Sequence, residues 1–206
     1  MARNKDRGTP EVSSGSMADI AFLLLIFFLV TTTIANDKGI LMTLPPPPDQ
    51  EQEQIDIPER NIFKILANSN DQLLVENEPY TKPISELKEE IKEFVLNFGN
   101  PNQEGIDTYN SLPTHMKARA KQRPESSDHP GKAIVSFKAN RGTSYDLYIQ
   151  IMDAAHAAYN EIYAERVGLT AQEFLELDQS KDVEKRMYLQ GRAGIPKAIS
   201  IAEPDK

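Results

Sequence analysis

The chain of 206 residues has no cysteine and no tryptophan, and its three histidines, His115, His129 and His156, lie far apart. Without cysteine the protein cannot form a disulfide framework, a thiolate nucleophile or a cysteine-ligated zinc site. No two histidines have the spacing of a metal-binding pair such as H-E-x-x-H. The cysteine-dependent enzymes are therefore excluded, and we expect no resident metal or organic cofactor.

Positive charge is also scarce. The 23 lysines and arginines face 31 aspartates and glutamates, which gives a formal net charge of −8. Proteins that bind nucleic acid neutralise phosphates with a basic face, so nucleic acid is not an expected partner. The sequence also lacks a P-loop or a G-x-G-x-x-G motif, and it shows no nucleophile–base–orienter set. We therefore expect a protein that is not an enzyme.

Long apolar runs are absent except for one. Residues 17–35 contain a single charged residue, and roughly 20 apolar residues are needed for a helix to cross the membrane core of about 30 Å. Arg3, Lys5 and Arg7 precede this run, whereas residues 36–55 hold one lysine. The positive-inside rule then predicts a cytoplasmic tail over residues 1–16, a transmembrane helix over residues 17–35 and export of the rest.

A cleaved signal peptide is the alternative interpretation of the same run. Residues 20–34 have the length of its apolar region, and Thr33-Ile34-Ala35 resembles a cleavage site, which would release a secreted binding or structural domain. Two details favour a retained helix: a signal peptide has no use for Asp19, and Phe27-Phe28 with the following threonines extends the run to spanning length.

Asp19 is the one ionisable residue of the apolar run, and its position allows two interpretations. In the first, it lies in the first helical turn near the lipid headgroups, where a carboxylate favours a helix N-terminus. In the second, Gly15 and Ser16 extend the helix, and Asp19 lies at membrane depth against a partner or a wet path, where carboxylates take up and release protons. The residues expected on its helical face are Ser16, Leu23, Ile26, Val30 and Thr33.

Residues 36–58 are predicted to form a linker. The four prolines 45–48 favour a stiff polyproline II spacer, and an acidic polar segment follows them. Just before the prolines lies a candidate strand that pairs with another chain or, as an equal alternative, packs on a membrane-proximal surface. Its residues are Ile40, Leu41, Met42, Thr43 and Leu44.

Residues 59–206 show the pattern of a periplasmic α+β domain, a small sheet with helices on one face. We expect a hairpin of residues 62–67 and 73–76, and a helix that starts at Ser85 and ends at Phe98 before Gly99. Residues 99–131 are interpreted as an insertion or long loop. This segment contains a basic cluster, Lys117, Arg119, Lys121 and Arg123. The cluster either contacts an acidic partner or an anionic polymer or, as we prefer, belongs to a solvated short helix.

The remaining pattern predicts a strand over residues 132–138 and a second long helix that Thr143 and Asp146 cap. His156 adjoins the apolar stripe of this helix and is expected to be a partly buried structural residue. A second insertion covers residues 159–194, where Thr170 opens a capping box, and residues 198–202 form a final strand.

Several of these stretches resemble the ExbD/TolR family of single-span inner-membrane proteins. Residues 17–31 are similar to the family's membrane helix, Thr43-Leu44-Pro45 to an N-L-P motif that follows it, and Tyr145 with Met152-Asp153 to a Y-(x)6-M-D motif. The resemblance covers residues 12–98, 132–158 and 197–203, and it departs over the two insertions.

The resemblance implies a proton-channel or stator subunit of a motor driven by the proton-motive force, with Asp19 as the proton carrier and protons as the coupling ion. Its expected partners are a second copy of the chain, a pentamer of an ExbB/TolQ-like multi-span protein, inner-membrane lipid and a TonB-like protein that opens outer-membrane transporters. A TolR-type role in envelope integrity remains the alternative within the family.

Overall fold

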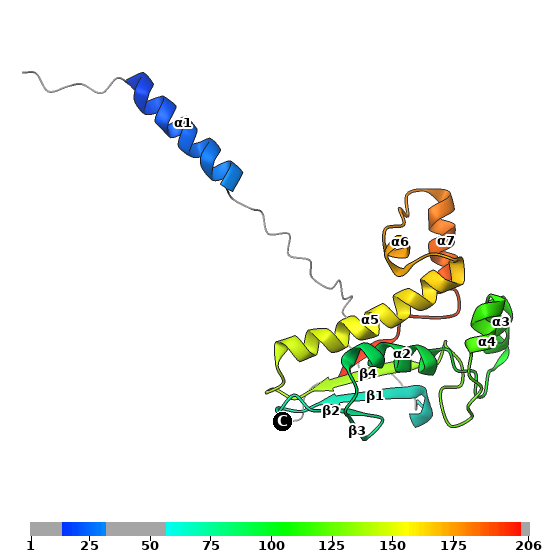
Figure 1. Ribbon diagram of the computed structural model, residues 1–206. Helices are drawn as coiled ribbons and strands as arrows, with labels where there is room; N and C mark the ends of the chain where they lie inside the picture. The colour runs from blue at the N-terminus through cyan, green and yellow to red at the C-terminus, as the bar shows by residue number, and fades with distance from the viewer. Residues whose placement is uncertain (1–13, 32–56, 203–206) are drawn as a thin grey trace, which may run out of the picture. The chain divides into compact units, whose positions relative to one another are not determined.

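The computed structural model describes residues 14–31 and 57–202, which belong to two compact units, one within residues 1–53 and one within residues 54–206. The first unit contains one described helix, α1 (Ser14–Thr31; Figure 1). It begins three residues before the predicted membrane helix and includes Gly15 and Ser16. Within these two ranges, no helix combines the length and the apolar character that crossing a membrane requires.

The second unit is built on a mixed sheet in the order β3-β2-β1-β4-β5. Antiparallel pairing joins β1 to β2 and β2 to β3, whereas β4 runs parallel to both of its neighbours. The strands are β1 (Ile62–Ala67), β2 (Leu73–Val75), β3 (Glu78–Tyr80), β4 (Ile134–Ala139) and β5 (Ile199–Ala202). The expected α+β class is therefore confirmed for this unit.

The predicted hairpin is confirmed as β1 and β2, which the 3-10 helix η1 (Glu59–Asn61) precedes. Asn68 closes the turn, because its Oδ1 accepts hydrogen bonds of 2.9 Å from the backbone N–H groups of Asn70 and Gln72. The sequence did not predict β3, which has three residues and contains Pro79. A proline has no N–H group to donate, and it is tolerated here because β3 lies at the edge of the sheet.

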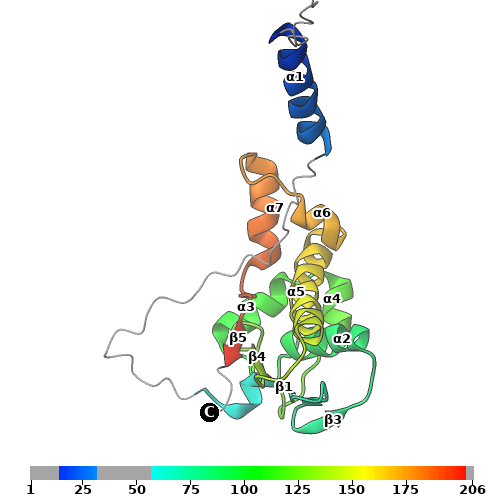
Figure 2. The same ribbon diagram turned by 90° about the vertical axis from the view of Figure 1, so that its left-hand side faces the viewer.

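Helices α2 (Ile84–Val95) and α5 (Tyr145–Val167) lie together on one face of the sheet (Figures 1 and 2). Alternate residues of β1 face them, and Ile65 is fully buried with Ile91 of α2 and Ile151 of α5. The hydrophobic core therefore lies between the sheet and these two helices, as the apolar stripes of the helices predict.

Helix α2 ends at Val95, so its predicted end at Phe98 is wrong. Asn97 leaves the helix because its side chain donates to the Arg123 carbonyl at 3.0 Å and accepts from the Arg123 N–H at 2.9 Å. The Phe98 N–H donates to the Lys121 carbonyl at 2.9 Å. Hydrogen bonds to a distant segment thus replace the last helical turn.

The interpretation of residues 99–131 as a long loop is also wrong in part, because this segment holds α3 (Gln103–Ser111) and α4 (Thr114–Arg119). Asn102 caps α3 by accepting a 2.9 Å hydrogen bond from the N–H of Gly105. The polar composition that suggested a loop therefore supplies a helix cap.

Ser144, and not the predicted Thr143, caps α5. The Ser144 hydroxyl accepts a 3.2 Å hydrogen bond from the Leu147 N–H, whereas the Thr143 hydroxyl donates at 3.1 Å to the carbonyl of Asn68 in the hairpin turn. Thr143 thus joins the start of α5 to the β1–β2 turn.

The chain beyond α5 follows the prediction. The Thr170–Glu173 capping box is present at the start of α6 (Ala171–Leu175), and α7 (Asp182–Arg192) comes next. The predicted final strand is β5, which pairs with β4.

Candidate functional site

Helix α1 exposes large apolar side chains around its whole circumference. At 100° per residue, nine such residues in a row of twelve positions leave no polar face. Helices with this pattern are surrounded by other protein or by lipid. The exposed residues, 42–63% accessible within this unit, are Met17, Ile20, Phe22, Leu23, Leu24, Leu25, Ile26, Phe27 and Phe28.

Asp19 is the only ionisable residue of α1, and it lies inside the helix. The first turn of α1 contains no acidic residue, because the helix begins at Ser14. With a rise of 1.5 Å per residue, Asp19 is about 7.5 Å along the helix axis. The helix dipole acts mainly within the first turn, so stabilisation of the N-terminus does not account for this carboxylate.

The face predicted to meet a partner is described in part. Leu23 and Ile26 lie within about 40° of Asp19 and are 58% and 42% exposed. Ser16 and Val30 belong to α1, but their side chains lie outside the described part of the chain. Thr33 and the candidate strand of residues 40–44 also lie outside it.

In the second unit, the predicted basic cluster lies against acidic residues of α2 and α5. Arg119 bonds to Glu165 at 3.1 Å, and Lys121 and Arg123 lie 3.9 and 3.7 Å from Glu93. Lys117 and Arg119 are on the short helix α4, as the preferred interpretation expected. Because three of the four basic side chains already face carboxylates of the same unit, the cluster has little charge to offer an acidic partner.

The buried histidines do not form a metal centre. His156 is half-buried beside the core, as predicted, and burial together with the Lys197 ammonium lowers its pKa. His129 is 1% exposed, and burial lowers its pKa as well. Among the described residues there is no group of three or more His, Asp or Glu side chains placed to hold a metal ion.

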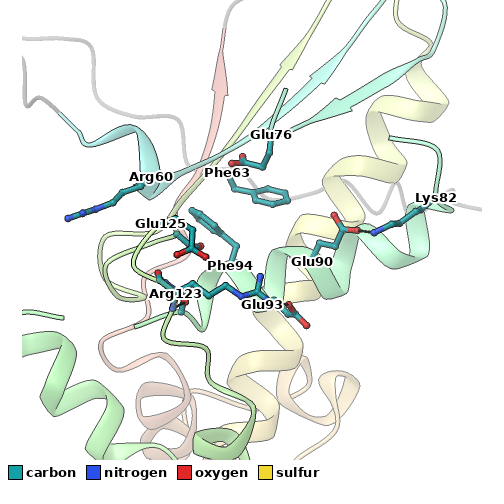
Figure 3. A pocket seen from close by; sticks show the side chains of 11 residues that line it. Arg60, Phe63, Glu76, Lys82, Glu90, Glu93, Phe94, Arg123 and Glu125 are labelled. Atoms are coloured by element: carbon teal, nitrogen blue, oxygen red, sulfur yellow. Dashed lines mark hydrogen bonds and ion pairs between the residues drawn. The ribbon is translucent and has the colours of Figure 1, made fainter. Parts of the chain in front are cut away.

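The second unit also contains a hollow of about 400 Å³ that the sequence did not predict. Its lining residues come from four separate segments between residues 60 and 126, including Phe63 of β1 and Phe94 of α2 (Figure 3). No local spacing connects these segments. The one available signal was Arg123, which the basic cluster singled out for another reason.

Comparison with known protein families places these features in context. The family model described as biopolymer transport protein ExbD/TolR matches residues 5–166, which is more than half of the chain. The chain belongs to the ExbD/TolR family. No curated protein matches it significantly. The match includes α1 with Asp19 and extends through residues 99–131, whereas α6, α7 and β5 follow its end.

Membership of the ExbD/TolR family defines a general role. The family consists of accessory proteins of biopolymer transport that are anchored in the inner membrane. Its members work with ExbB/TolQ-type and TonB/TolA-type partners. The family name covers both the ExbD and the TolR types.

Proposed function

We propose that this chain is the proton-carrying subunit of an inner-membrane motor of the ExbB–ExbD type, which uses the proton-motive force to energise TonB-dependent outer-membrane transport. In this proposal residues 17–31 of α1 belong to a single membrane span over residues 17–35, with residues 1–16 in the cytoplasm and the second unit in the periplasm. One observation carries the proposal: an apolar helix, exposed on all sides within its unit, bears one carboxylate inside its length.

The described part of α1 is shorter than the span that the sequence predicts. Its 18 residues extend about 27 Å, which is less than the hydrocarbon thickness of about 30 Å. The predicted span continues through residues 32–35, which lie outside the described residues. Asp19 would then lie nearer to the cytoplasmic end of the span than to its periplasmic end.

Asp19 is suited to couple proton transfer to movement. The free energy needed to place its side chain in an apolar environment depends on whether the carboxyl group is ionised. An ionised aspartate at the centre of a membrane helix costs about 2.5–3.5 kcal/mol on insertion scales, and less toward the ends. Polar groups of a partner would hold the ionised form, whereas the protonated form passes an apolar wall more easily. Each proton that crosses 100 mV makes about 2.3 kcal/mol available for movement.

A partner is required because one helix cannot enclose Asp19. We propose a pentamer of an ExbB/TolQ-like protein around two copies of this chain, with alternating protonation of Asp19 driving one type of subunit against the other. The second unit would pass the movement to a TonB-like protein. The family membership supports partners of these types.

The decisive experiment compares Asp19→Asn with Asp19→Glu in cells that lack the native gene. Asn cannot ionise, so we expect uptake of a radiolabelled iron–siderophore to fall to the level of uncoupled cells, while the variant still co-purifies with its ExbB-like partner. Glu retains the carboxyl group and is expected to keep part of the activity. Leu24→Ala, about 140° from Asp19 on the helix, is the matched control and should transport normally. Full uptake by Asp19→Asn would refute the proton-carrier role.

Two further measurements test the finer parts of the proposal. A deletion strain should lose siderophore uptake and retain resistance to detergent, because a TolR-type protein would give the opposite pattern. N-terminal sequencing of the mature protein should find residues 1–35 still attached. A mature chain that begins at Asn36 would instead identify a secreted domain.

A further inference from the structure

The hollow in the second unit has an aromatic floor. Phe63 and Phe94 lie with their ring centroids 5.2 Å apart and their planes at 46°. They come from β1 and α2, and both line the hollow although they are only 5% and 8% exposed (Figure 3). Charged residues surround this ring pair.

The basic residues at the hollow already have acidic partners. Lys82 bonds to Glu90 at 2.7 Å, and Arg123 lies 3.7 Å from Glu93. Arg60 lies 2.6 Å from Asp128, and Figure 3 shows its guanidinium directed away from the ring pair. None of these cations is therefore available to neutralise further acids.

Two carboxylates at the hollow, those of Glu76 and Glu125, form no ion pair with any residue that the structure describes. Glu125 has no hydrogen bond or ion pair with any residue that the structure describes, and Figure 3 shows it beside Phe94. Glu76 lies beside Phe63 and accepts a 2.5 Å hydrogen bond from the Lys64 N–H, while the Lys64 ammonium is ion-paired with Glu59. Burial raises the pKa of Glu76, and the hydrogen bond and charge of Lys64 offset this rise only in part.

Two further hollows lie along the β2–β3 hairpin. A second hollow of about 220 Å³ shares Phe63 and Glu76 with the first, and a third of about 550 Å³ is lined by apolar residues such as Leu74 and Leu147. The second and third hollows share Pro79 and Tyr80. Neighbouring hollows that share lining residues suit an extended chain better than a compact small molecule. Pro79 lies in the edge strand β3, so a partner chain would bind through its side chains and not by adding a strand.

We propose that the three hollows together dock an extended segment of a partner protein. The hollow over Phe63 and Phe94 receives an arginine side chain of that segment. A guanidinium stacks on aromatic rings and at the same time donates paired hydrogen bonds to carboxylates. Glu76 and Glu125 supply the carboxylates, and the phenylalanines supply the rings. Apolar residues of the same segment fit the third hollow.

The test uses the full chain in nanodiscs of neutral phosphatidylcholine, so that a basic peptide does not bind to the lipid. The probe is Ac-Leu-Gly-Ala-Arg-Ala-Gly-NH2 carrying a neutral dye, and its binding is followed by fluorescence anisotropy. The matched probe has citrulline in place of arginine, which has the same shape without the charge. We expect the arginine peptide to bind about tenfold more tightly, and its binding to weaken as salt is raised.

Three variants locate the binding. Glu125→Gln and Glu76→Gln should each weaken the arginine peptide about threefold or more and leave the citrulline peptide unchanged. Glutamine at position 76 keeps the acceptor for the Lys64 N–H, so the fold is preserved. Glu176→Gln removes the same charge at an exposed position that follows α5 in the sequence and does not line the hollow. This control variant should bind the arginine peptide as tightly as the unaltered chain. Equal binding of the two peptides, or equal weakening by Glu176→Gln, would overturn the proposal.

Discussion

The Nζ of Lys92 lies 2.8 Å from the Oε2 of Glu161, although the Lys92 side chain is only 4% exposed. This contact joins α2 to α5 across the helical layer of the second unit. Lys92 also bonds to Glu165 at 3.1 Å. Burial alone would lower the pKa of Lys92, but the hydrogen bonds that its ammonium donates to Glu161 and Glu165 outweigh burial, and the pKa is raised. The lysine is therefore held in its charged form inside the domain.

Replacing Lys92 is expected to destabilise this domain. Lys92→Met keeps the length of the side chain but removes the charge that faces two partly buried carboxylates, so we expect the free energy of unfolding to fall by about 2 kcal/mol. Lys88→Met is the control, because Lys88 bonds to Glu161 at 2.5 Å from a more exposed position and should cost about 1 kcal/mol or less. Urea unfolding followed by circular dichroism measures both. Equal losses for the two variants would contradict this account.

The stability of the second unit should depend on pH through His129. Burial lowers its pKa below the ordinary 6.5, and the nearby carboxylates of Glu104 and Asp128 do not offset this. The unfolded chain therefore binds a proton more readily than the folded one. The contribution of His129 to the free energy of unfolding is fully present above about pH 6.5. It falls as the pH drops toward the lower pKa of the folded state, and it levels off below that pKa.

His129→Leu should flatten this dependence. The quantity to compare is the change in the free energy of unfolding between pH 7.5 and pH 5.5, which we expect to shrink by about 1 kcal/mol. His156 shifts in the same direction and leaves a residual slope. His115 is exposed on α4, so His115→Gln should keep the full pH dependence. A slope unchanged by His129→Leu would show that its burial is not the cause.

Two glycines with left-handed backbone angles provide a matched pair. Gly168 ends α5 at a φ of 75°, and a Cβ there would meet no atom within 4 Å, so Gly168→Ala should cost only the backbone strain of about 1–2 kcal/mol. Gly194 has a φ of 70°, and a Cβ there would overlap the Thr108 hydroxyl of α3. Gly194→Ala should therefore lower the midpoint of thermal unfolding more than Gly168→Ala does. The opposite order would mean that α3 does not pack against this turn.

The parts of the fold that the sequence predicted correctly depend on residues close together in the chain. The turn formers at Asn68–Asp71 specify the hairpin, and the Thr170–Glu173 box specifies the start of α6. Asp19 was also singled out from local sequence, since a lone charge in an apolar run is visible without a structure, and its role as a proton carrier stays a prediction.

The errors arise where a distant segment decides the local structure. The apolar spacing up to Phe98 predicted a helix that continues through Asn97, but the hydrogen bonds of Asn97 to Arg123 end α2 earlier. The hollow over Phe63 and Phe94 escaped prediction for the same reason, because its walls meet only in the folded domain. Tertiary contacts of this kind override local propensity and leave no periodic trace.

The parallel pairing of β4 with β5 affects how the domain is made during translation. β5 follows every other described element, and Tyr163 of α5 donates a 2.9 Å hydrogen bond to Ile195 just before it. A nascent chain halted at Gly194 would thus hold β4 with one bare edge, the kind of surface that recruits other chains into aggregates. The ribosome must synthesise the chain through Ala202 before β5 can pair with β4. A chaperone that shields β4 would therefore act on the chain before β5 is complete.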